Sequence, residues 1–329
     1  MKSNVLLLKQ IESRLSHSRI MSARPEAEAL VRHFGKMSRI ELFAGEKALT
    51  AAARNRIHSA SKARLRGKPI AYLLKETEFF GHRFFVTENA LIPRPETEFL
   101  VQEALRLLDR YYPAGQSKVS CHCERGRSRG EAISSERSPR ALCALAMTAY
   151  SPAILDLGTG SGCIAVSVTL ERPDCRMTAL DVSSSVLKIA RKNIKYHYLG
   201  KKIALVQSDL FGAFGKEKKA YWDMIVSNPP YVPEEDLPGL PKEVQNEPRL
   251  ALNGGAKGFR VIDKILDQAP HFLKSGGWLL MEIGQGQSKL LKKKLLRSRF
   301  FGNLRVVKDF NGIDRILVIQ KRTVTNWTN

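Results

Sequence analysis

The sequence predicts an α/β protein: a doubly wound, mainly parallel sheet with a terminal antiparallel hairpin, preceded by a small helical domain. Three observations predict this fold class. From residue 151 onward, apolar strand-like runs alternate with helical patterns, which is typical of a parallel sheet covered by helices. Near the end, Asn311-Gly312 separates two strand-like runs, which is a strong hairpin signal. Residues 1–75 show helical periodicity instead.

Length and composition indicate a globular protein without membrane contact. The 329 residues suggest about two domains, and 43% of them are hydrophobic, which is enough for a buried core. No apolar run approaches the roughly 20 residues that a membrane helix needs. The first residues are amphipathic and soon charged, unlike a secretory signal. We therefore expect a cytoplasmic protein.

The five cysteines predict neither a disulfide framework nor a metal site. Their number is odd in a long chain. Cys121-His122-Cys123 lacks the two-residue spacing that is usual for zinc, and no second pair of ligands follows. We therefore expect no metal.

The formal net charge of +22 favours acidic partners, nucleic acid included. A generally basic proteome would produce the same charge on a solvated surface. The charge therefore does not indicate which reaction occurs, and direct nucleic-acid binding is neither required nor excluded by it.

Residues 1–75 are expected to form a helical domain that recognises a partner. Leu7, Ile11 and Leu15 recur at helical spacing. Ser38-Arg39-Ile40-Glu41 fits a capping box, in which a hydroxyl and a carboxylate satisfy free amides at a helix start. Residues 51–65 favour a helix that the following glycine and proline end. No catalytic constellation occurs in this region.

Residues 76–95 are expected to form a β-hairpin and a linker. Two phenylalanine-rich runs, 78–80 and 83–86, flank a turn at Gly81-His82. Ile92-Pro93-Arg94-Pro95 must be largely extended, because each proline restricts the residue before it. A helix is expected from near residue 96 through residue 108.

Residues 96–329 are expected to form the sheet domain. A stretch at 114–150 is rich in Ser, Arg and Gly without apolar period, and we expect an exposed, disordered insertion there. The expected parallel strands are 153–157, 176–180, 203–207, 223–226 and 278–283. Helices are expected at 184–197 and 258–273, and the hairpin strands at 304–308 and 315–320.

A glycine-rich loop follows the first of these strands and opens a helix. It reads Gly158-Thr159-Gly160-Ser161-Gly162 after Asp156-Leu157. Glycines let the backbone pass close to a ligand, and a helix start offers free N–H groups. The spacing differs from the dinucleotide pattern G-x-G-x-x-G, which favours a nucleoside-methionine ligand over a pyrophosphate. A purely structural turn is the alternative.

Aspartates end the second and third strands. Asp181 can accept hydrogen bonds from both hydroxyls of a ribose, or it can cap the helix that follows. Asp209 can accept from an adenine amino group while Leu210 packs against the ring. An isolated aspartate at such a place is otherwise a turn residue.

Asn228-Pro229-Pro230-Tyr231 ends the fourth strand and is the predicted catalytic and substrate-binding loop. An amide or aromatic amine nitrogen is a poor nucleophile, because its lone pair is delocalised. The side-chain oxygen of Asn228 and the carbonyl of Pro229 can accept its two N–H bonds and orient the lone pair toward a methyl donor. The prolines, Pro230 included, stiffen the loop, and Tyr231 can pack on the planar target.

These motifs follow four consecutive strands, and ligands in open α/β sheets bind beyond the carboxyl ends of the strands. The sheet plan is that of class I methyltransferases. We therefore expect one site for S-adenosylmethionine, lined by Gly158, Thr159, Gly160, Ser161, Gly162, Asp181, Asp209, Leu210 and Asn228. The catalytic loop alone leaves glutamine and adenine equally open as targets.

The chain resembles the release-factor glutamine N5-methyltransferases over nearly its whole length, except the insertion at 114–150. Beside the glycine and catalytic loops, the segments that carry the resemblance are Arg66-Gly67-Lys68-Pro69-Ile70-Ala71-Tyr72, Phe79-Phe80-Gly81, residues 91–98, and Asn246-Glu247-Pro248-Arg249-Leu250-Ala251-Leu252 with Gly254, Gly255 and Gly258. The combination is more specific than any one motif.

The resemblance implies methyl transfer from S-adenosylmethionine to the glutamine of the Gly-Gly-Gln loop in peptide chain release factors. It implies cofactor contacts at the glycine loop, Asp181 and Leu210, with the glutamine amide held by residues 228–231. Relatives often carry an aromatic residue where this chain has Leu210. This difference predicts weaker stacking on adenine.

Three alternatives compete with this interpretation. The first is N6-adenine methylation of DNA or RNA, which would require base flipping. The second is methylation of a glutamine in a ribosomal protein, and the third is a catalytically silent binding module that the insertion has disabled. The helical region shows no familiar nucleic-acid module, and the intact loops argue against a silent module.

Overall fold

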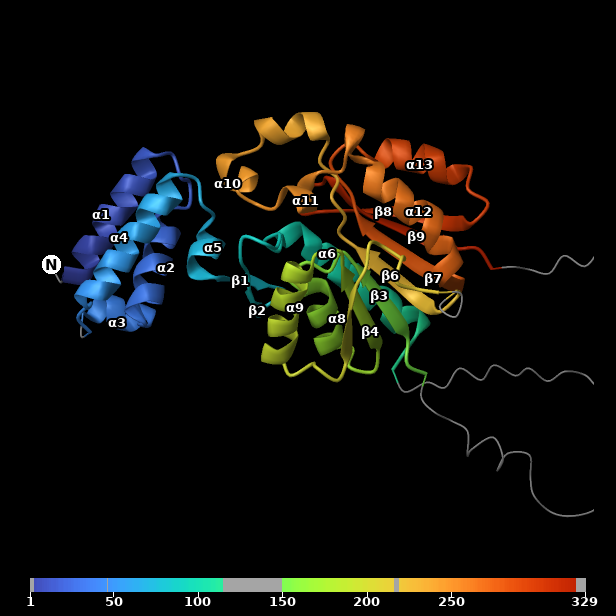
Figure 1. Cartoon of the computed structure of the whole chain (residues 1–329), viewed down its shortest axis with the longest axis horizontal. Helices are drawn as coiled ribbons and strands as arrows, with labels where there is room; N and C mark the ends of the chain where they lie inside the picture. The colour runs from blue at the N-terminus through green and yellow to red at the C-terminus, as the bar shows by residue number, and fades with distance from the viewer. Residues whose placement is uncertain (1–2, 46, 115–149, 216–218, 324–329) are drawn as a thin grey trace, which may run out of the picture.

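The computed structural model describes residues 3–45, 47–114, 150–215 and 219–323. A helical bundle stands at one end of the molecule and a sheet domain at the other (Figure 1). Leu7, Ile11 and Leu15 of the first helix are buried in the core of the bundle, as their helical spacing predicts. The helices of this region are α1 (Ser3–His17), α2 (Ala23–Gly35), α3 (Arg39–Ala44), α4 (Ala51–Leu65) and α5 (Ile70–Leu74).

The start of α3 confirms the predicted capping box. The backbone N–H of Glu41 donates to the Ser38 hydroxyl at 3.2 Å, and the Glu41 carboxylate accepts from the Ser38 N–H at 2.6 Å. These bonds satisfy two amides that a helix start leaves free. They also lower the pKa of the Glu41 carboxyl.

A two-stranded antiparallel hairpin connects the bundle to the sheet domain. Its strands are β1 (Glu76–Phe79) and β2 (His82–Phe85), and Gly81 in the turn has a φ of +72°. The extended linker that follows leads into α6 (Pro95–Tyr111), which has a proline in its first turn. The Glu98 carboxylate accepts from the Phe80 N–H at 2.8 Å, so α6 also holds the hairpin.

The second domain is built on a sheet that has seven strands in the described part of the chain, in the order β5-β4-β3-β6-β7-β9-β8. β3 to β7 pair in parallel, whereas β9 pairs antiparallel with β7 and β8. The strands are β3 (Ala153–Leu157), β4 (Arg176–Asp181), β5 (Ile203–Gln207), β6 (Trp222–Ser227), β7 (Leu273–Glu282), β8 (Phe301–Lys308) and β9 (Asp314–Lys321).

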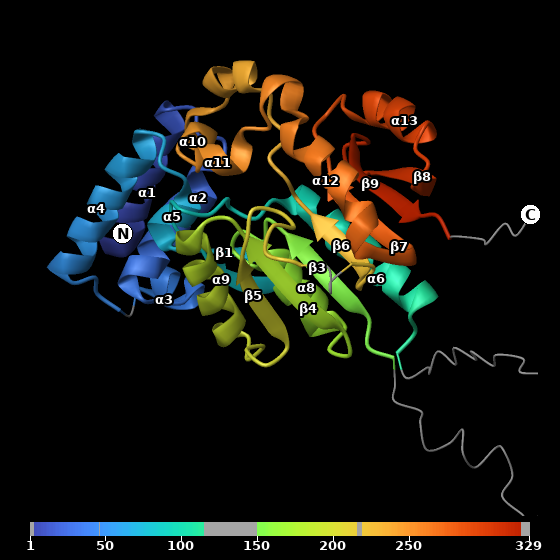
Figure 2. The same cartoon turned by 45° about the vertical axis from the view of Figure 1, so that its right-hand side comes forward.

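Helices cover both faces of this sheet, as Figure 2 shows. Neighbouring residues of a strand face opposite sides, so Ile154 packs into one apolar core and Leu155 into the other. The first core includes residues of α6, α8 (Cys163–Glu171) and α9 (Ser184–Tyr196). The second includes residues of α12 (Arg260–Phe272) and α13 (Ser288–Leu296). The result is the three-layer arrangement of a doubly wound fold.

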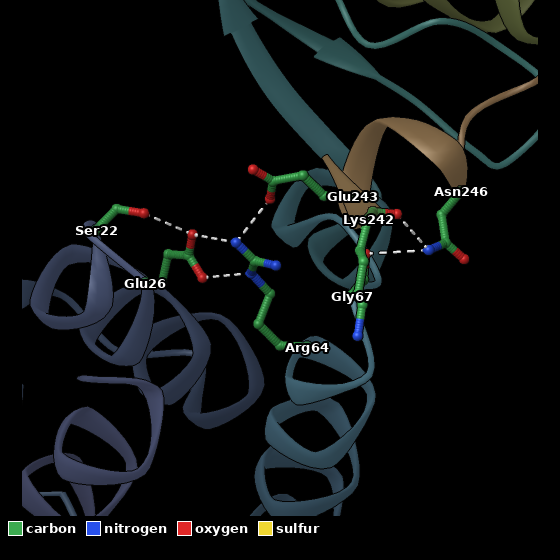
Figure 3. Close-up of polar contacts among 7 residues, drawn as sticks. All are labelled: Ser22, Glu26, Arg64, Gly67, Lys242, Glu243 and Asn246. Carbon is green, nitrogen blue, oxygen red and sulfur yellow. Dashed lines mark hydrogen bonds and ion pairs between the residues drawn. The ribbon is translucent and has the colours of Figure 1, made fainter. Parts of the chain in front are cut away.

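A long connection between β6 and α12 crosses back to the helical bundle. It contains η2 (Glu234–Gly239), α10 (Lys242–Gln245), α11 (Arg249–Leu252) and η3 (Ala256–Gly258). Figure 3 shows Arg64 of α4 between Glu26 of α2 and Glu243 of α10. The Arg64 guanidinium donates to Glu26 at 2.6 and 3.1 Å and to Glu243 at 2.7 Å. This ion pair joins the bundle to the connection that follows residues 228–231.

The predicted fold class is confirmed, although several elements begin or end at other residues than expected. β7 begins at Leu273, earlier than expected, because Leu273 pairs with Trp222 across an irregularity in the ladder. α12 begins only at Arg260, because Gly258 has a φ of +75° and cannot continue a right-handed helix.

Some expectations fall outside the described residues. They include the insertion predicted at 114–150, of which only the two ends are described, and Cys121 and Cys123. Within the described residues, no helix combines the length and apolarity needed to cross a membrane.

Removal of the Arg64 side chain should destabilise the protein strongly. Arg64 and Glu26 expose only 7% and 8% of their side chains, so Arg64→Ala leaves a buried, unpaired carboxylate. We expect a loss of about 3–5 kcal/mol in the free energy of unfolding, measured by urea denaturation. The control is Arg24→Ala, which breaks the more exposed pair with Glu12 and should cost about 0–1 kcal/mol. Equal losses would contradict this account.

Candidate active site

A cavity of about 370 Å³ lies at the carboxyl ends of the parallel strands. This volume lies within the range of ligand pockets for small molecules. The predicted residues that line it follow four neighbouring strands: Gly158, Thr159, Gly160, Ser161, Asp181, Asp209, Leu210, Asn228 and Pro230. The linker before α6 and the first turn of α6 close another side, with Arg94 and Thr97 in the wall. The structure thus brings most of the predicted site residues together.

The glycine loop between β3 and α8 forms one wall. Gly158 and Gly160 have φ values of +71° and +58°, and a Cβ added to either would meet nothing within 4 Å. The bare backbone of the loop therefore borders open space, as a cradle for a ligand requires. Gly162 is different: it is the N-cap of α8, and an added Cβ would lie 3.4 Å from Cβ of Ala190.

Hydrogen bonds fix this loop to the ends of β3 and β4. The Thr159 N–H donates to the Leu180 carbonyl at 2.8 Å, and the Thr159 hydroxyl donates to the Asp156 carboxylate at 2.7 Å. Asp156 is fully buried, and burial raises its pKa to about 7. Asn193 of α9 also holds the loop, because its side-chain amide donates to the Ser161 carbonyl at 2.8 Å.

Asp181 both lines the cavity and braces its walls. One carboxylate oxygen accepts from the Gly160 N–H at 3.1 Å and the other from the Ser183 N–H at 3.0 Å. The N-cap of α9 is Ser183, whose hydroxyl accepts from the Val186 N–H. Burial raises the pKa of the Asp181 carboxyl above its usual range. Each oxygen accepts one of these bonds and has a further lone pair for a ligand.

Leu210 lies in the cavity wall in a strained conformation. Its φ is +47°, which is unfavourable for a residue with a side chain. The Ser208 hydroxyl stabilises this turn, because it donates to the Leu210 carbonyl at 2.8 Å and accepts from the Ala213 N–H at 2.9 Å. Asp209 is exposed at the rim of the cavity beside Leu210.

Asn228 lies directly after β6, with its amide nitrogen fixed. The side-chain N–H donates to the Thr97 hydroxyl at 3.0 Å. Among the residues that the structure describes, none donates to the Asn228 amide oxygen or to the Pro229 carbonyl. Pro229 itself is buried outside the cavity lining. The Asn228 amide oxygen is thus left for a ligand, whereas a contact of the Pro229 carbonyl with a ligand stays a prediction.

Tyr231 is turned into the protein. In the described part of the chain it is not among the residues that line the cavity, and its hydroxyl donates to Glu282 at 3.0 Å. Burial raises the pKa of both Tyr231 and Glu282. Gln287 holds the backbone of the loop by donating to the Tyr231 carbonyl at 3.1 Å and to the Gly258 carbonyl at 3.2 Å. Packing of Tyr231 on a planar target stays a prediction.

Sequence reasoning missed four residues that support the site: Thr97, Asn193, Glu247 and Glu282. Each is buried, and each bonds to residues far away in the sequence. One signal could have found Glu282, which ends the fifth parallel strand, because the motifs already follow strands one to four. Thr97 stands inside the 91–98 segment, where only a resemblance pointed to it.

Glu247 ties together two segments that carried that resemblance. Its carboxylate accepts from the Ile92 N–H at 3.0 Å and from the Arg94 guanidinium. The neighbouring Asn246 donates to the Gly67 carbonyl at 3.3 Å and to the Lys242 carbonyl at 2.8 Å (Figure 3). Residues 66–72, 91–98 and 246–252 are therefore one connected structure beside the cavity.

The cavity residues fit a nucleoside-methionine cofactor. The glycine loop offers open backbone, Asp181 offers carboxylate acceptors for hydroxyl groups, and Leu210 offers an apolar side chain for a flat ring. In the described residues, no group of His, Cys, Asp and Glu could hold a metal ion.

Comparisons with known proteins agree with this geometry. Residues 140–239 match the methyltransferase small domain, and residues 7–74 match the PrmC N-terminal domain. The release factor glutamine methyltransferase of Chlorobaculum tepidum is 35% identical over 95% of both chains. That of Thermodesulfovibrio yellowstonii is 32% identical over 90% of this chain and 92% of its own.

A solved structure shares the fold. The catalytic domain of hMettl16, solved with a hairpin of the MAT2A 3'UTR, superposes with a TM-score of 0.52 and covers 86% of each chain. The two sequences are 14% identical. This likeness shows the methyltransferase fold alone.

Cofactor affinity should depend on pH through Asp181. An ionised carboxylate at this position can accept from ligand hydroxyls, and it loses acceptor capacity when it is protonated. Because burial raises its pKa, affinity for S-adenosylmethionine should be full above that raised pKa and fall as the pH drops through it. In calorimetric titrations, Asp181→Asn should bind about tenfold more weakly and lose this pH dependence. Exposed Asp267→Asn is the control. Persistence of the pH dependence in Asp181→Asn would contradict the assignment.

Gly258 should not tolerate a side chain. An added Cβ would lie 2.1 Å from the Tyr231 carbonyl oxygen and 2.7 Å from Nε2 of Gln287. We expect Gly258→Ala to lose about 3 kcal/mol of stability in urea unfolding, from overpacking and backbone strain together. Gly286→Ala is the matched control, because its φ is +85° but nothing lies within 4 Å. It should lose about 1 kcal/mol; a similar loss in both would refute the close contact.

Proposed function

Because this chain belongs to the release factor glutamine methyltransferase family, we propose that its cavity binds S-adenosylmethionine and its Asn228 loop binds the acceptor glutamine. The enzyme transfers the methyl group to the side-chain amide nitrogen, N5, of the glutamine in the Gly-Gly-Gln motif of peptide chain release factors. One observation carries the assignment of residues. Asn228 and Pro230 line the same cavity as the glycine loop and Asp181, so acceptor and donor sites adjoin.

The loop oxygens are suited to hold a glutamine amide. An amide nitrogen has two N–H bonds, and two oxygens of the loop, those of the Asn228 side chain and the Pro229 backbone, can accept them. These bonds orient the nitrogen lone pair toward the cavity, so much of the barrier is removed by positioning. As positive charge grows on the nitrogen, the same oxygens stabilise it. The proton then becomes acidic, so no strong base is needed before transfer.

The other wall residues hold the cofactor. The glycine loop receives its methionine part, Asp181 accepts from the ribose hydroxyls, and Asp209 and Leu210 contact the adenine. When bound, S-adenosylmethionine supplies an electrophilic methyl group.

The helical domain is proposed to recognise the release factor. Residues 1–75 form this unit, residues 76–95 the hairpin and linker, and residues 96–329 the methyltransferase domain. Arg64 and Asn246 connect the first and third units through α10. A partner bound to the bundle would therefore be placed at a fixed distance from the catalytic loop. Because the substrates act in translation, we also propose a cytoplasmic location.

The alternative targets are not favoured by the relatives, whose names specify release factor glutamine. Adenine in DNA or RNA and glutamine in a ribosomal protein use the same loop chemistry. They therefore serve as competing substrates in the test that follows, and a silent binding module would label none of them.

The decisive experiment offers methyl-labelled S-adenosylmethionine with release factor, ribosomal proteins or nucleic acid. We expect label on the release factor, and none when its loop glutamine is replaced by alanine. Asn228→Ala should lower kcat by about 10²-fold or more, the scale for loss of a group that stabilises a transition state. Its affinity for the cofactor should change little. Asn311→Ala, in an exposed turn, is the control. Label on nucleic acid alone would overturn the proposal.

A further inference from the structure

A chain of buried hydrogen bonds ends on the catalytic asparagine. Thr97 donates to Oε2 of Glu282 at 2.6 Å, and Tyr231 donates to Oε1 of Glu282 at 3.0 Å. The side-chain nitrogen of Asn228 donates to the Thr97 hydroxyl oxygen at 3.0 Å. Thr97 is 2% exposed and Glu282 is fully buried. These residues come from different elements, so the chain links α6, the end of β7 and the loop after β6.

The direction of each bond follows from a count of protons. A hydroxyl has one hydrogen, and the hydrogen of Thr97 is used toward Glu282 at a distance typical of an ionised acceptor. The Thr97 oxygen can therefore only accept from Asn228. The same holds when Glu282 carries a proton on Oε1, toward Tyr231. In both of these protonation states the atom of Asn228 that faces Thr97 is its nitrogen, as in the structure, and the amide oxygen is the other terminal atom.

We propose that Thr97 and Glu282 are positioning residues that fix the polarity of the Asn228 amide, so that its oxygen faces the methyl-accepting nitrogen. The proposal rests on the proposed function, since only an amide substrate needs this oxygen. A flipped Asn228 would present N–H groups to the N–H groups of the substrate. It would also place its oxygen against the lone pairs of Thr97. The buried carboxyl thus selects the one orientation that can bind the target.

The local structure explains how Thr97 and Glu282 come to lie beside Asn228. Thr97 lies in the first turn of α6, where its N–H bonds back to the Arg94 carbonyl at 3.0 Å. Glu282 follows Met281, which pairs with Ser227 in the β6–β7 ladder, so the strand register brings the carboxyl beside residue 228. Glu247 holds the Arg94 end of the linker. Thr97, Glu282 and Asn228 therefore lie on or directly beside rigid elements, as precise positioning requires.

The test compares Thr97→Val with Thr97→Ser in methylation of release factor. Valine has the shape of threonine without the hydroxyl, whereas serine keeps the hydroxyl. We expect Thr97→Val to lower kcat about tenfold, the effect of one hydrogen bond, with cofactor affinity changed less than about twofold. Thr97→Ser should restore most of kcat. In the Asn228→Ala background, Thr97→Val should cause no further loss, because coupled residues are not additive.

Specific outcomes would overturn the proposal. They are wild-type kcat in Thr97→Val, no rescue by serine, or additive losses with Asn228→Ala. If Thr97→Val does not fold, as circular dichroism would show, Thr97→Ala replaces it with the same expectations. A structural role alone would lower stability in both backgrounds equally without a rescue of kcat.

A second measurement does not depend on turnover. In protein labelled with ¹⁵N-asparagine, the side-chain protons of Asn228 should exchange slowly with solvent in the wild type and in Thr97→Ser. They should exchange faster in Thr97→Val; equal rates would overturn the positioning role. Absence of methyl transfer by the wild type would instead overturn the proposed function, while the exchange rates still decide this inference.

Discussion

The buried carboxylate of Glu247 is the constraint on which the arrangement around the site depends. A buried charge is costly unless it is paired, and Glu247 meets this need with the Ile92 N–H and the Arg94 guanidinium. The linker and the connection after β6 must therefore lie together. In the same short stretch, Asn246 donates to the Gly67 carbonyl and Glu243 accepts from Arg64. Residues 243–247 therefore also fix the position of the helical bundle.

This arrangement explains why segments that are far apart in the sequence border the same cavity. The start of α6, directly after the linker, supplies Thr97, the connection starts after residues 228–231, and both border the cavity. Substitutions at Glu247 or Asn246 would affect methyl transfer by displacing the linker and the connection, not by removing a contact with the acceptor. The loop of residues 228–231 is thus supported on one side by β6 and β7, and on the other by Thr97 at the start of α6.

Local patterns predicted much of this structure. The capping box at Ser38 depends on residues three positions apart, and the strand limits at 153–157 and 203–207 follow from short apolar runs, so the sequence shows them directly. The glycine loop and the strand-end aspartates were predicted because the fold places such positions at one edge.

The residues that support the site were not predicted. Asn228 and Thr97 are 131 residues apart and Thr97 and Glu282 are 185 apart. Only the register of β6 and β7 and the path of the linker bring them together. Tyr231 illustrates the same limit, because its partner Glu282 is specified by tertiary structure.

The strand order also has a consequence for synthesis of the chain on the ribosome. β3 is the first strand of the large sheet to be made, and it lies near the middle of the order β5-β4-β3-β6-β7-β9-β8. β4 can then join β3, β5 can join β4, and β6 and β7 can extend the other side in turn. Only β8 must wait, because its partner β9 is made after it. The nascent sheet can therefore grow outward from its centre, and the last hairpin closes one edge when translation is nearly complete.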